Sequence, residues 1–236
     1  MLEKSEGLVI KTTRYSESSV IARIFTREFG WLNFHIPGVR SSKNKSKGNL
    51  FQPLQYLEMD IYHHPGKNLM KMKEYRPGYI YRKLPFDMIR QSVAIFMLEV
   101  LSKCIHEEER NPLLYDFVRQ RLIQLDEDER LDLMMPANFL LQLSTILGFQ
   151  PLASDHDQAE YFHLEDGHFD EMAGHPEMTL DLKTSEVLKR ILNDASSVLT
   201  SLERQLLVDG FIRYFQIHIP GFKQPTSLDI LRQVLR

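Results

Sequence analysis

Cysteine is almost absent from this chain of 236 residues, in which only Cys104 occurs. A single cysteine excludes a disulfide within the chain and any Cys-x-x-Cys metal site. Cys104 lies among apolar residues at helical spacing, which indicates a core position rather than a nucleophile.

Long hydrophobic runs are missing as well. No apolar run approaches the roughly 20 residues that a membrane-spanning helix needs. The first seven residues are acidic and polar, unlike the basic start and apolar stretch of a signal peptide. We therefore expect a cytoplasmic protein with no membrane partner.

The chain also lacks the common nucleotide-binding and nucleophile motifs. Gly66-Lys67 is followed by Asn68 and has no upstream glycine at the required spacing, so it is not a Walker A sequence. No Gly-x-Ser-x-Gly sequence is present. The sequence predicts a protein that is not an enzyme and needs no cofactor.

Acidic residues are scarce in the first third of the chain and abundant afterwards. Residues 1–80 contain 13 Lys and Arg against 7 Asp and Glu, whereas the remainder contains 16 against 25. The net charge of −3 therefore averages two unlike parts. This asymmetry favours binding of a polyanion by the first part only.

The most basic stretch runs from Ile36 to Leu50 and contains no acidic residue. Its cations are Arg40, Lys43, Lys45 and Lys47. In an extended conformation the three lysines would project from one side, about 6.6 Å apart. That spacing suits successive phosphates of a nucleic-acid backbone. The alternative is a solvated loop that happens to be basic.

The first 80 residues have the pattern of short strands. Apolar and polar residues alternate at Leu32–Ile36 and Leu57–Ile61, and residues 7–13 and 20–26 are rich in β-branched side chains. Leu69–Tyr75 is interpreted as a fifth, short strand. Five short strands without a helical segment predict a small closed antiparallel barrel of the OB-fold class, which binds single strands. The fold class is thus mixed, with an OB-fold domain at 1–80 and a mainly helical domain at 81–236.

Helical periodicity begins after Pro85. It predicts helices at about 86–106, from Pro112, at 139–147 with Gly148 at the C-terminal end, at 184–194 and at 202–218. Thr226 with Asp229 resembles a capping box for a last helix. Residues 150–178 have no sustained period, and a short hairpin is expected around Asp166-Gly167.

Aromatic and further basic residues in the first domain extend the candidate binding surface. Trp31, Phe29, Tyr15 and Tyr62 stand near strand ends, where they either stack on bases or pack inside the barrel. Arg14 and Arg23 are candidate phosphate contacts. The same holds for Arg27, Lys71, Lys73 and Arg76.

The segment 155–175 contains enough imidazole and carboxylate groups to suggest a metal-dependent hydrolase. The residues are Asp155, His156, Asp157, His163, Asp166, His168, Asp170 and His175. Zinc sites favour closely spaced ligands, and here the histidines are 7, 5 and 7 residues apart. A solvated polar insertion is therefore the better interpretation, and an RNA-binding OB module is a further alternative.

Several short stretches occur in a fixed order along the chain. They are Gly7–Ile10 with Tyr15–Glu17, Gly38–Lys43 followed by Leu50–Leu54, Phe139–Pro151, and Arg213–His218 followed by Ser227–Leu231. In this order they resemble the RecO family of bacterial recombination-mediator proteins.

The resemblance implies an OB fold and a helical domain that bind single- and double-stranded DNA and anneal complementary strands at the nucleoid. It implies RecR and single-stranded-DNA-binding protein (SSB) as partners, and assistance in loading RecA onto SSB-coated strands. The family's DNA-contacting loop corresponds to Arg40, Lys43, Lys45 and Lys47. Many members hold zinc with four cysteines in the segment matching 150–178. This chain has none there, so no zinc is expected, although histidine ligands remain an alternative.

The SSB tail is acidic with an apolar end, so its site needs an apolar groove edged by cations. Cations are scarce in the helical part. The candidates are Arg119, Arg121, Lys183, Lys189, Arg190 and Arg204. The sequence does not choose among them.

Overall fold

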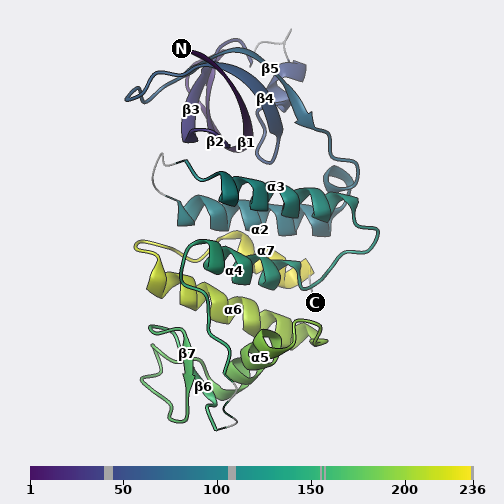
Figure 1. Cartoon of the computed structure of the whole chain (residues 1–236). Helices are drawn as coiled ribbons and strands as arrows, with labels where there is room; N and C mark the ends of the chain where they lie inside the picture. Colours follow the sequence, from purple (N-terminus) through teal and green to yellow (C-terminus); the bar gives the residue numbers. More distant parts are fainter. Residues whose placement is uncertain (40–44, 106–109, 155, 157, 235–236) are drawn as a thin grey trace. The chain divides into compact units, whose positions relative to one another are not determined.

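The computed structural model describes residues 1–39, 45–105, 110–154, 156 and 158–234. Two compact units make up the chain. The first contains Met1–Leu98 and Ile105–Glu129, and the second contains Glu99–Cys104 and Arg130–Arg236. Figure 1 shows the first unit as mainly strands together with α3 and most of α2, and the second as mainly helices.

The first unit contains one antiparallel sheet of five strands among the described residues, in the order β3-β2-β1-β4-β5. The strands are β1 Leu2–Arg14, β2 Val20–Thr26, β3 Gly30–Ile36, β4 Tyr56–Tyr62 and β5 Lys71–Tyr79. All five predicted strands are confirmed, and β1 is longer than expected because it pairs with β4 along its first half and β2 along its second.

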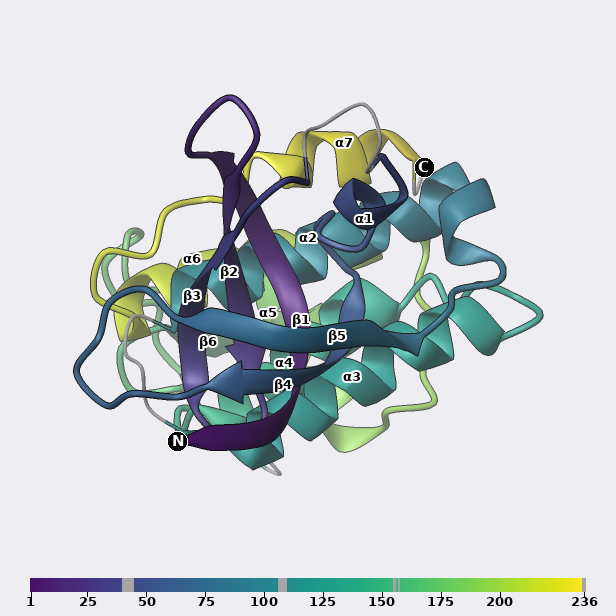
Figure 2. The ribbon, with the colours of Figure 1, turned by 90° about the horizontal axis from the view of Figure 1, so that it is seen from above.

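The sheet is not closed, which corrects the closed barrel expected from the sequence. The two edge strands meet only at an isolated parallel bridge between Phe34 and Met70. There the His35 N–H donates to the Met70 carbonyl at 3.1 Å, and the Met70 N–H donates to Asn33 at 2.8 Å. Figure 2 shows the start of β5 beside β3. Such a sheet agrees with the partly open form of the OB fold.

One face of the sheet forms the core of the strand region. Its buried side chains include Val9, Ile24, Phe34, Leu57, Met59 and Met70. At Gly7 a Cβ atom would clash with the side chains of Ile24 and Met59, so only glycine fits where β1 crosses this core. Because side chains alternate along a strand, the neighbouring residues point to the opposite, outer face.

Part of the outer face is covered by α3 (Pro112–Glu127). The Tyr115 ring packs against Phe25 and Tyr56, with ring centroids 5.6 and 6.2 Å apart. Leu8, Phe25 and Tyr56 are consequently buried on the side that faces away from the strand core. The first compact unit thus extends beyond residue 80, the boundary that composition predicts, and includes a helix.

The chain between β5 and α2 (Met88–Cys104) is fixed by Asp126 of α3. This carboxylate is fully buried and accepts the backbone N–H groups of Arg82, Lys83 and Leu84 at 2.7 to 3.1 Å. Burial opposes ionisation, but these hydrogen bonds lower the pKa of Asp126 below its ordinary value. A short 3-10 helix, Leu84–Phe86, follows.

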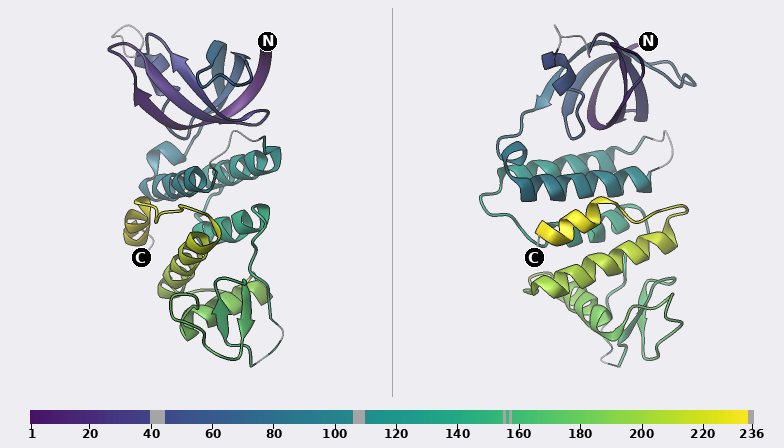
Figure 3. Two further views of the ribbon diagram at one scale, coloured as in Figure 1. Left: turned by 90° about the vertical axis from the view of Figure 1, so that its left-hand side faces the viewer. Right: turned by 180° about the vertical axis from the view of Figure 1, so that it is seen from behind.

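The second unit is built from helices with a small hairpin beside α5 (Figure 3). Its elements are α4 Met135–Ile146, β6 Tyr161–His163, β7 His168–Asp170, α5 Leu182–Asn193, α6 Ser201–His218 and α7 Ser227–Val234. The predicted C-terminal Gly148 is confirmed, with φ at 86°, and Gly167 has φ at 69° in the turn of the predicted hairpin. Both angles favour glycine.

The capping box lies at a different helix from the one predicted. Thr200 and Glu203 form it at the start of α6. Thr226, in contrast, donates its N–H and hydroxyl to Glu99 at 2.9 and 3.2 Å, so a carboxylate from α2 holds the start of α7. Sequence spacing identifies partners three residues apart, but it does not reveal a partner that comes from another helix.

Candidate nucleic-acid interface

The predicted basic loop contains a short helix, α1, at Lys45–Asn49. The backbone of Lys45 and Lys47 is therefore helical and not in the extended conformation that was considered for the lysines. Lys47 is exposed. Arg40 and Lys43 lie outside the described residues, as does the Lys45 side chain.

The pairing of strands brings other cations together on the outer face. Lys11 of β1 lies opposite Arg23 of β2, and Arg23 lies opposite Asn33 of β3. In the next row Thr13, Ile21 and His35 are opposite one another. Strand alternation places Lys71 on the same side as His35, across the bridge between Phe34 and Met70.

We call this surface the basic face. It consists of Lys11, Arg23, His35 and Lys71. Arg14 adjoins its edge where β1 ends, but its pairing with the core residue Val20 turns its side chain to the opposite side of the sheet from Lys11. The rows that contain Lys11, Arg23 and His35 hold no Asp or Glu. The nearest acidic residues in sequence are Glu17 in the exposed β1–β2 turn, three residues after Arg14, and Glu74 on β5, three residues after Lys71. The chain leaves β3 toward the basic loop at Ile36, which is paired with Val20 beside this turn. The basic loop therefore begins at the edge of the basic face.

The outer face of β1, β4 and β5 has a different charge. One row across these strands is Lys4, Asp60 and Glu74, and the next is Glu6, Glu58 and Arg76. Lys47 lines the same open hollow as these residues and Glu28. Carboxylates outnumber cations in this hollow, so the surroundings of Lys47 favour a polyanion less than those of the basic face do.

Several predicted cations form ion pairs within the first unit. Arg27 holds Asp116 of α3 with two hydrogen bonds of 2.8 Å, and this partner raises the pKa of Arg27 above its ordinary value. Arg76 pairs with Glu58 across β4 and β5. In contrast, Lys11, Arg14 and Lys71 are exposed and form no ion pair with a described residue. Their charges are available to a ligand.

Trp31, a predicted base-stacking residue, is buried. Only 3% of it is exposed, its ring stacks on Phe25 at 5.1 Å, and the Arg23 guanidinium lies 4.6 Å above it. Trp31 therefore packs against the covered outer face and supports Arg23. Of the other predicted aromatics, Phe29 stacks on His63 at 4.1 Å, whereas Tyr15 and Tyr62 are exposed.

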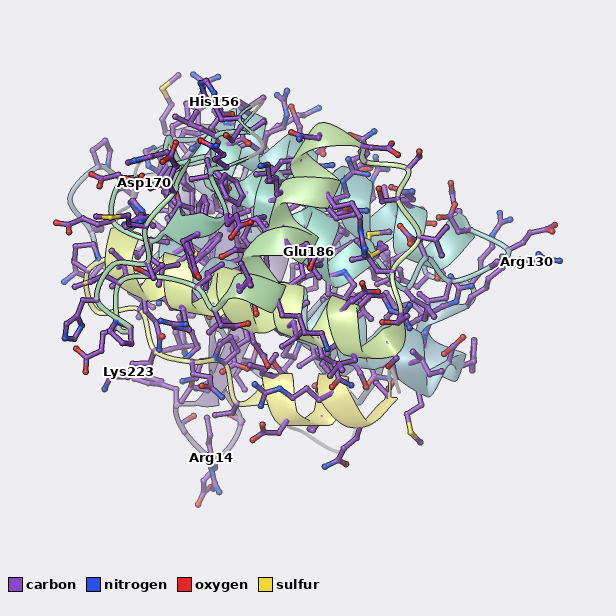
Figure 4. All side chains as sticks on the ribbon, turned by 90° about the horizontal axis from the view of Figure 1, so that it is seen from below. Arg14, Arg130, His156, Asp170, Glu186 and Lys223 are labelled. Carbon is purple, nitrogen blue, oxygen red and sulfur yellow. The ribbon has the colours of Figure 1, made fainter. Side chains whose placement is uncertain are left out.

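The histidine-rich segment gathers no metal site in the described part of the chain. No group of three His, Cys, Asp or Glu side chains there has the arrangement of metal ligands. His163 and His168 stack with ring centroids 5.9 Å apart on β6 and β7. Figure 4 shows His156 and Asp170 on the outside of the second unit. Asp155 and Asp157 lie outside the described residues.

The second unit carries an apolar groove between α4, α6 and α7. Its apolar lining is Leu133, Pro136, Ala137, Val208, Leu228 and Leu231. Arg204 and Arg232 also line it. Arg232 is held by Asp209 and Asp229 at 2.6 and 2.9 Å, while Arg204 donates to the Leu199 carbonyl at 2.7 Å. Of the six cations considered for an acidic partner, Arg204 lies at this groove.

Sequence reasoning did not select Lys11 and His35 as site residues. A partial signal was present, because Lys11 and Arg23 each follow an apolar residue, Ile10 and Ala22, within runs predicted as strands. Which strands are adjacent, and therefore which cations share a face, follows only from the pairing. In a separate observation, none of the described helices is long and apolar enough to cross a membrane.

Known proteins resemble both parts of this chain. Residues 1–81 match the family model "Recombination protein O N terminal", and residues 85–172 match "Recombination protein O C terminal". The DNA repair protein RecO of Flavobacterium psychrophilum is 31% identical, with 98% of each chain covered. The DNA repair protein RecO of Phocaeicola vulgatus is also 31% identical, with 99% of each covered.

The chain belongs to the RecO family. It is therefore a member of a DNA repair family, as the order of short stretches in the sequence predicted. The RecO domain models meet between residues 81 and 85, whereas the first compact unit continues through α3. The covering helix of the sheet thus comes from the part of the chain that matches the C-terminal RecO model.

Proposed function

We propose that this RecO-family chain binds single-stranded DNA through its basic face and the adjoining basic loop, and that it also binds duplex DNA by the same charges. The observation that carries this proposal is the group of cations Lys11, Arg23 and Lys71 on one face of the sheet, with Arg14 at the end of β1 beside the start of the loop. The loop contributes Arg40, Lys43, Lys45 and Lys47. Trp31 supports the site from beneath Arg23 and does not contact DNA.

Binding of this kind uses the phosphate backbone and releases counterions, so it depends little on sequence and strongly on salt. Annealing follows from the same chemistry. A protein that neutralises the phosphates of two complementary strands reduces their repulsion, so base pairs form between them without nucleotide hydrolysis. We place this activity at the bacterial nucleoid, without enzymatic turnover.

The proposed protein partners come from family membership and, for SSB, also from the apolar groove of the second unit. We propose that the acidic, apolar-ended tail of SSB binds the groove of the second unit, with its apolar end against Val208, Leu228 and Leu231 and its carboxylates near Arg204. RecR as a partner, and assistance to RecA on SSB-coated strands, rest on family membership alone.

A salt series tests the DNA proposal with matched variants. Lys11→Ala with Arg14→Ala removes two cations from the basic face, and Lys4→Ala with Arg76→Ala removes the same two residue types from the mixed hollow. Fluorescence anisotropy with labelled single-stranded DNA measures the affinity, and the first variant should bind more weakly than the unmodified protein. The slope of log affinity against log salt concentration should become shallower by up to about 0.7 for each phosphate that is no longer neutralised. The second should bind like the unmodified protein.

The loop is tested separately by replacing Arg40, Lys43, Lys45 and Lys47 with Ala. A weaker affinity and a flatter slope support its place in the interface. If the basic-face and loop variants both keep their affinity and slope, the proposed interface is wrong. Equal binding and annealing of RNA would favour an RNA-binding module instead.

The groove is tested with a peptide of the SSB tail. Arg204→Glu should abolish binding of the peptide, while Lys183→Glu, an exposed change on α5, should leave it unchanged. DNA affinity should be the same in both variants within about twofold, because a charge change outside the DNA interface is screened beyond about 10 Å. Undiminished peptide binding by the Arg204 variant would overturn this assignment.

A further inference from the structure

Tyr15 is an exposed aromatic side chain at the end of the basic face. It follows Arg14, the last residue of β1, and 60% of it is accessible to solvent. The aromatics of β2 and β3 have a different environment, since Phe25, Phe34 and Trp31 are at most 3% exposed, and Tyr62 at the end of β4 is less exposed than Tyr15, at 42%. Packing of the fold therefore does not account for a tyrosine at this position.

The Tyr15 ring is held in place. The Tyr15 N–H donates to the Ser19 carbonyl at 3.1 Å, and the Ser16 and Ser19 hydroxyl groups are joined at 2.6 Å, so the turn is closed by hydrogen bonds. The imidazole of His35 on β3 contacts the ring edge-to-face, with centroids 5.5 Å apart and an interplanar angle of 71°. An aromatic side chain that is already positioned loses little conformational freedom when it binds a ligand.

Tyr15 lies at the end of the basic face. Arg14 precedes it in the chain, His35 packs against it, and Lys71 lies across the bridge from His35. An open ring beside positive charges is the combination that binds single strands, in which a base stacks on the ring while the flanking phosphates meet the cations.

We propose that Tyr15 stacks on one unpaired base at the basic face and so gives the site its preference for single strands over duplex. This inference rests on the proposed DNA-binding function and adds to it the residue that distinguishes the two substrates. A duplex offers the same phosphates, but its bases are already stacked on each other and present no open face to Tyr15. The charges thus bind both forms, and the ring binds one.

The test uses the full chain, a short labelled oligo(dT) and a duplex of equal length, each across a salt series. Tyr15→Ala should weaken binding of oligo(dT) about 5- to 150-fold, the range for loss of one stacked base. Its duplex affinity should change less than about twofold, and its salt slope should stay the same because no charge is lost. Tyr15→Phe keeps the ring and should bind oligo(dT) like the unmodified protein.

Arg14→Ala serves as the contrasting variant, because loss of a charge should weaken both substrates and flatten both slopes. If Tyr15→Ala keeps its affinity for oligo(dT), or loses affinity equally for the duplex, the stacking role is wrong while the proposed interface stands. If the unmodified protein binds neither substrate, the DNA-binding proposal itself fails, and if Arg14→Ala, the other basic-face variants and the loop variant all change nothing, the proposed interface is wrong.

Discussion

The carboxylate of Asp126 accepts the backbone N–H of Leu84 at 2.7 Å, although the two residues are 42 positions apart in the chain. Asp126 lies near the end of α3, and Leu84 lies where the chain turns from β5 toward α2. The hydroxyl of Tyr79, the last residue of β5, donates to the same carboxylate at 3.0 Å. One buried side chain thus joins the end of the sheet to the helix that covers it.

Replacing Asp126 with Ala should destabilise the first unit by about 3 kcal/mol, because several buried donors would lose their charged acceptor. Urea unfolding followed by tryptophan fluorescence measures this, since Trp31 lies in the same unit. Glu129→Gln, a change at an exposed position close by, is the control and should alter the free energy of unfolding by less than about 0.5 kcal/mol. An equal effect of the two changes would contradict the role of Asp126.

Tyr115 on α3 should be essential to the same unit. Tyr115→Ala removes the ring that packs on Phe25 and Tyr56 and leaves a cavity against the outer face of the sheet. We expect a loss of about 3–4 kcal/mol in the free energy of unfolding. Leu113→Ala on the same helix is the matched control, because Leu113 is 67% exposed. A small effect of Tyr115→Ala would show that α3 does not stabilise the sheet.

Glu99 should make the stability of the second unit depend on pH. Burial opposes its ionisation, but hydrogen bonds from Ser227 and Thr226 lower the pKa of Glu99 to about 2, against an ordinary value of 4.5. A carboxyl whose folded-state pKa is lowered stabilises the fold fully above about pH 4.5, and this contribution is lost as the pH falls toward 2.

Glu99→Gln should therefore lower the free energy of unfolding by about 2 kcal/mol at pH 7. The difference from the unmodified protein should shrink steadily between pH 5 and about pH 2. Urea unfolding at several pH values, monitored by circular dichroism, measures it. Glu186→Gln, at an exposed position on α5 that Figure 4 labels, should show no such trend. A constant difference for Glu99→Gln at all pH values would refute the linkage.

Two glycines of the second unit offer a matched comparison. Gly148 and Gly167 both have positive φ, at 86° and 69°, but their surroundings differ. An added Cβ at Gly148 meets nothing within 4 Å, whereas at Gly167 it would clash with the Tyr214 hydroxyl. Gly148→Ala should cost about 1 kcal/mol for the backbone conformation alone, and Gly167→Ala distinctly more. Equal melting temperatures in differential scanning calorimetry would contradict this difference.

The local elements of the fold could be predicted because their signals are local. Alternation at Leu32–Ile36 and Leu57–Ile61 identified β3 and β4, and the positive-φ glycines Gly148 and Gly167 fell where a helix end and a hairpin turn were expected. The short helix in the basic loop was not predicted, because a one-turn helix at Lys45–Asn49 is too short to produce a helical period in the sequence.

The candidate interface could be predicted only in part. Arg14 and Arg23 were selected by charge, and strand pairing places Arg23 on the basic face and Arg14 at its edge. Trp31 was selected as an exposed aromatic, but α3 covers that part of the sheet and leaves it 3% exposed. Charge and residue type are visible in a sequence, whereas exposure depends on which distant segment lies on top.

The sequence alone determined the class of the protein: a basic strand-rich part, an acidic helical part, and the order of short stretches typical of the RecO family. Only the tertiary structure decided which cations share a surface, which aromatic side chains are exposed to solvent, and that the five-stranded sheet is not closed. The physical reason is that composition and periodicity act between near neighbours in the chain. A face of a sheet, in contrast, is assembled from residues on separate strands, such as Lys11, Arg23 and Lys71, whose adjacency is fixed by hydrogen bonds between those strands.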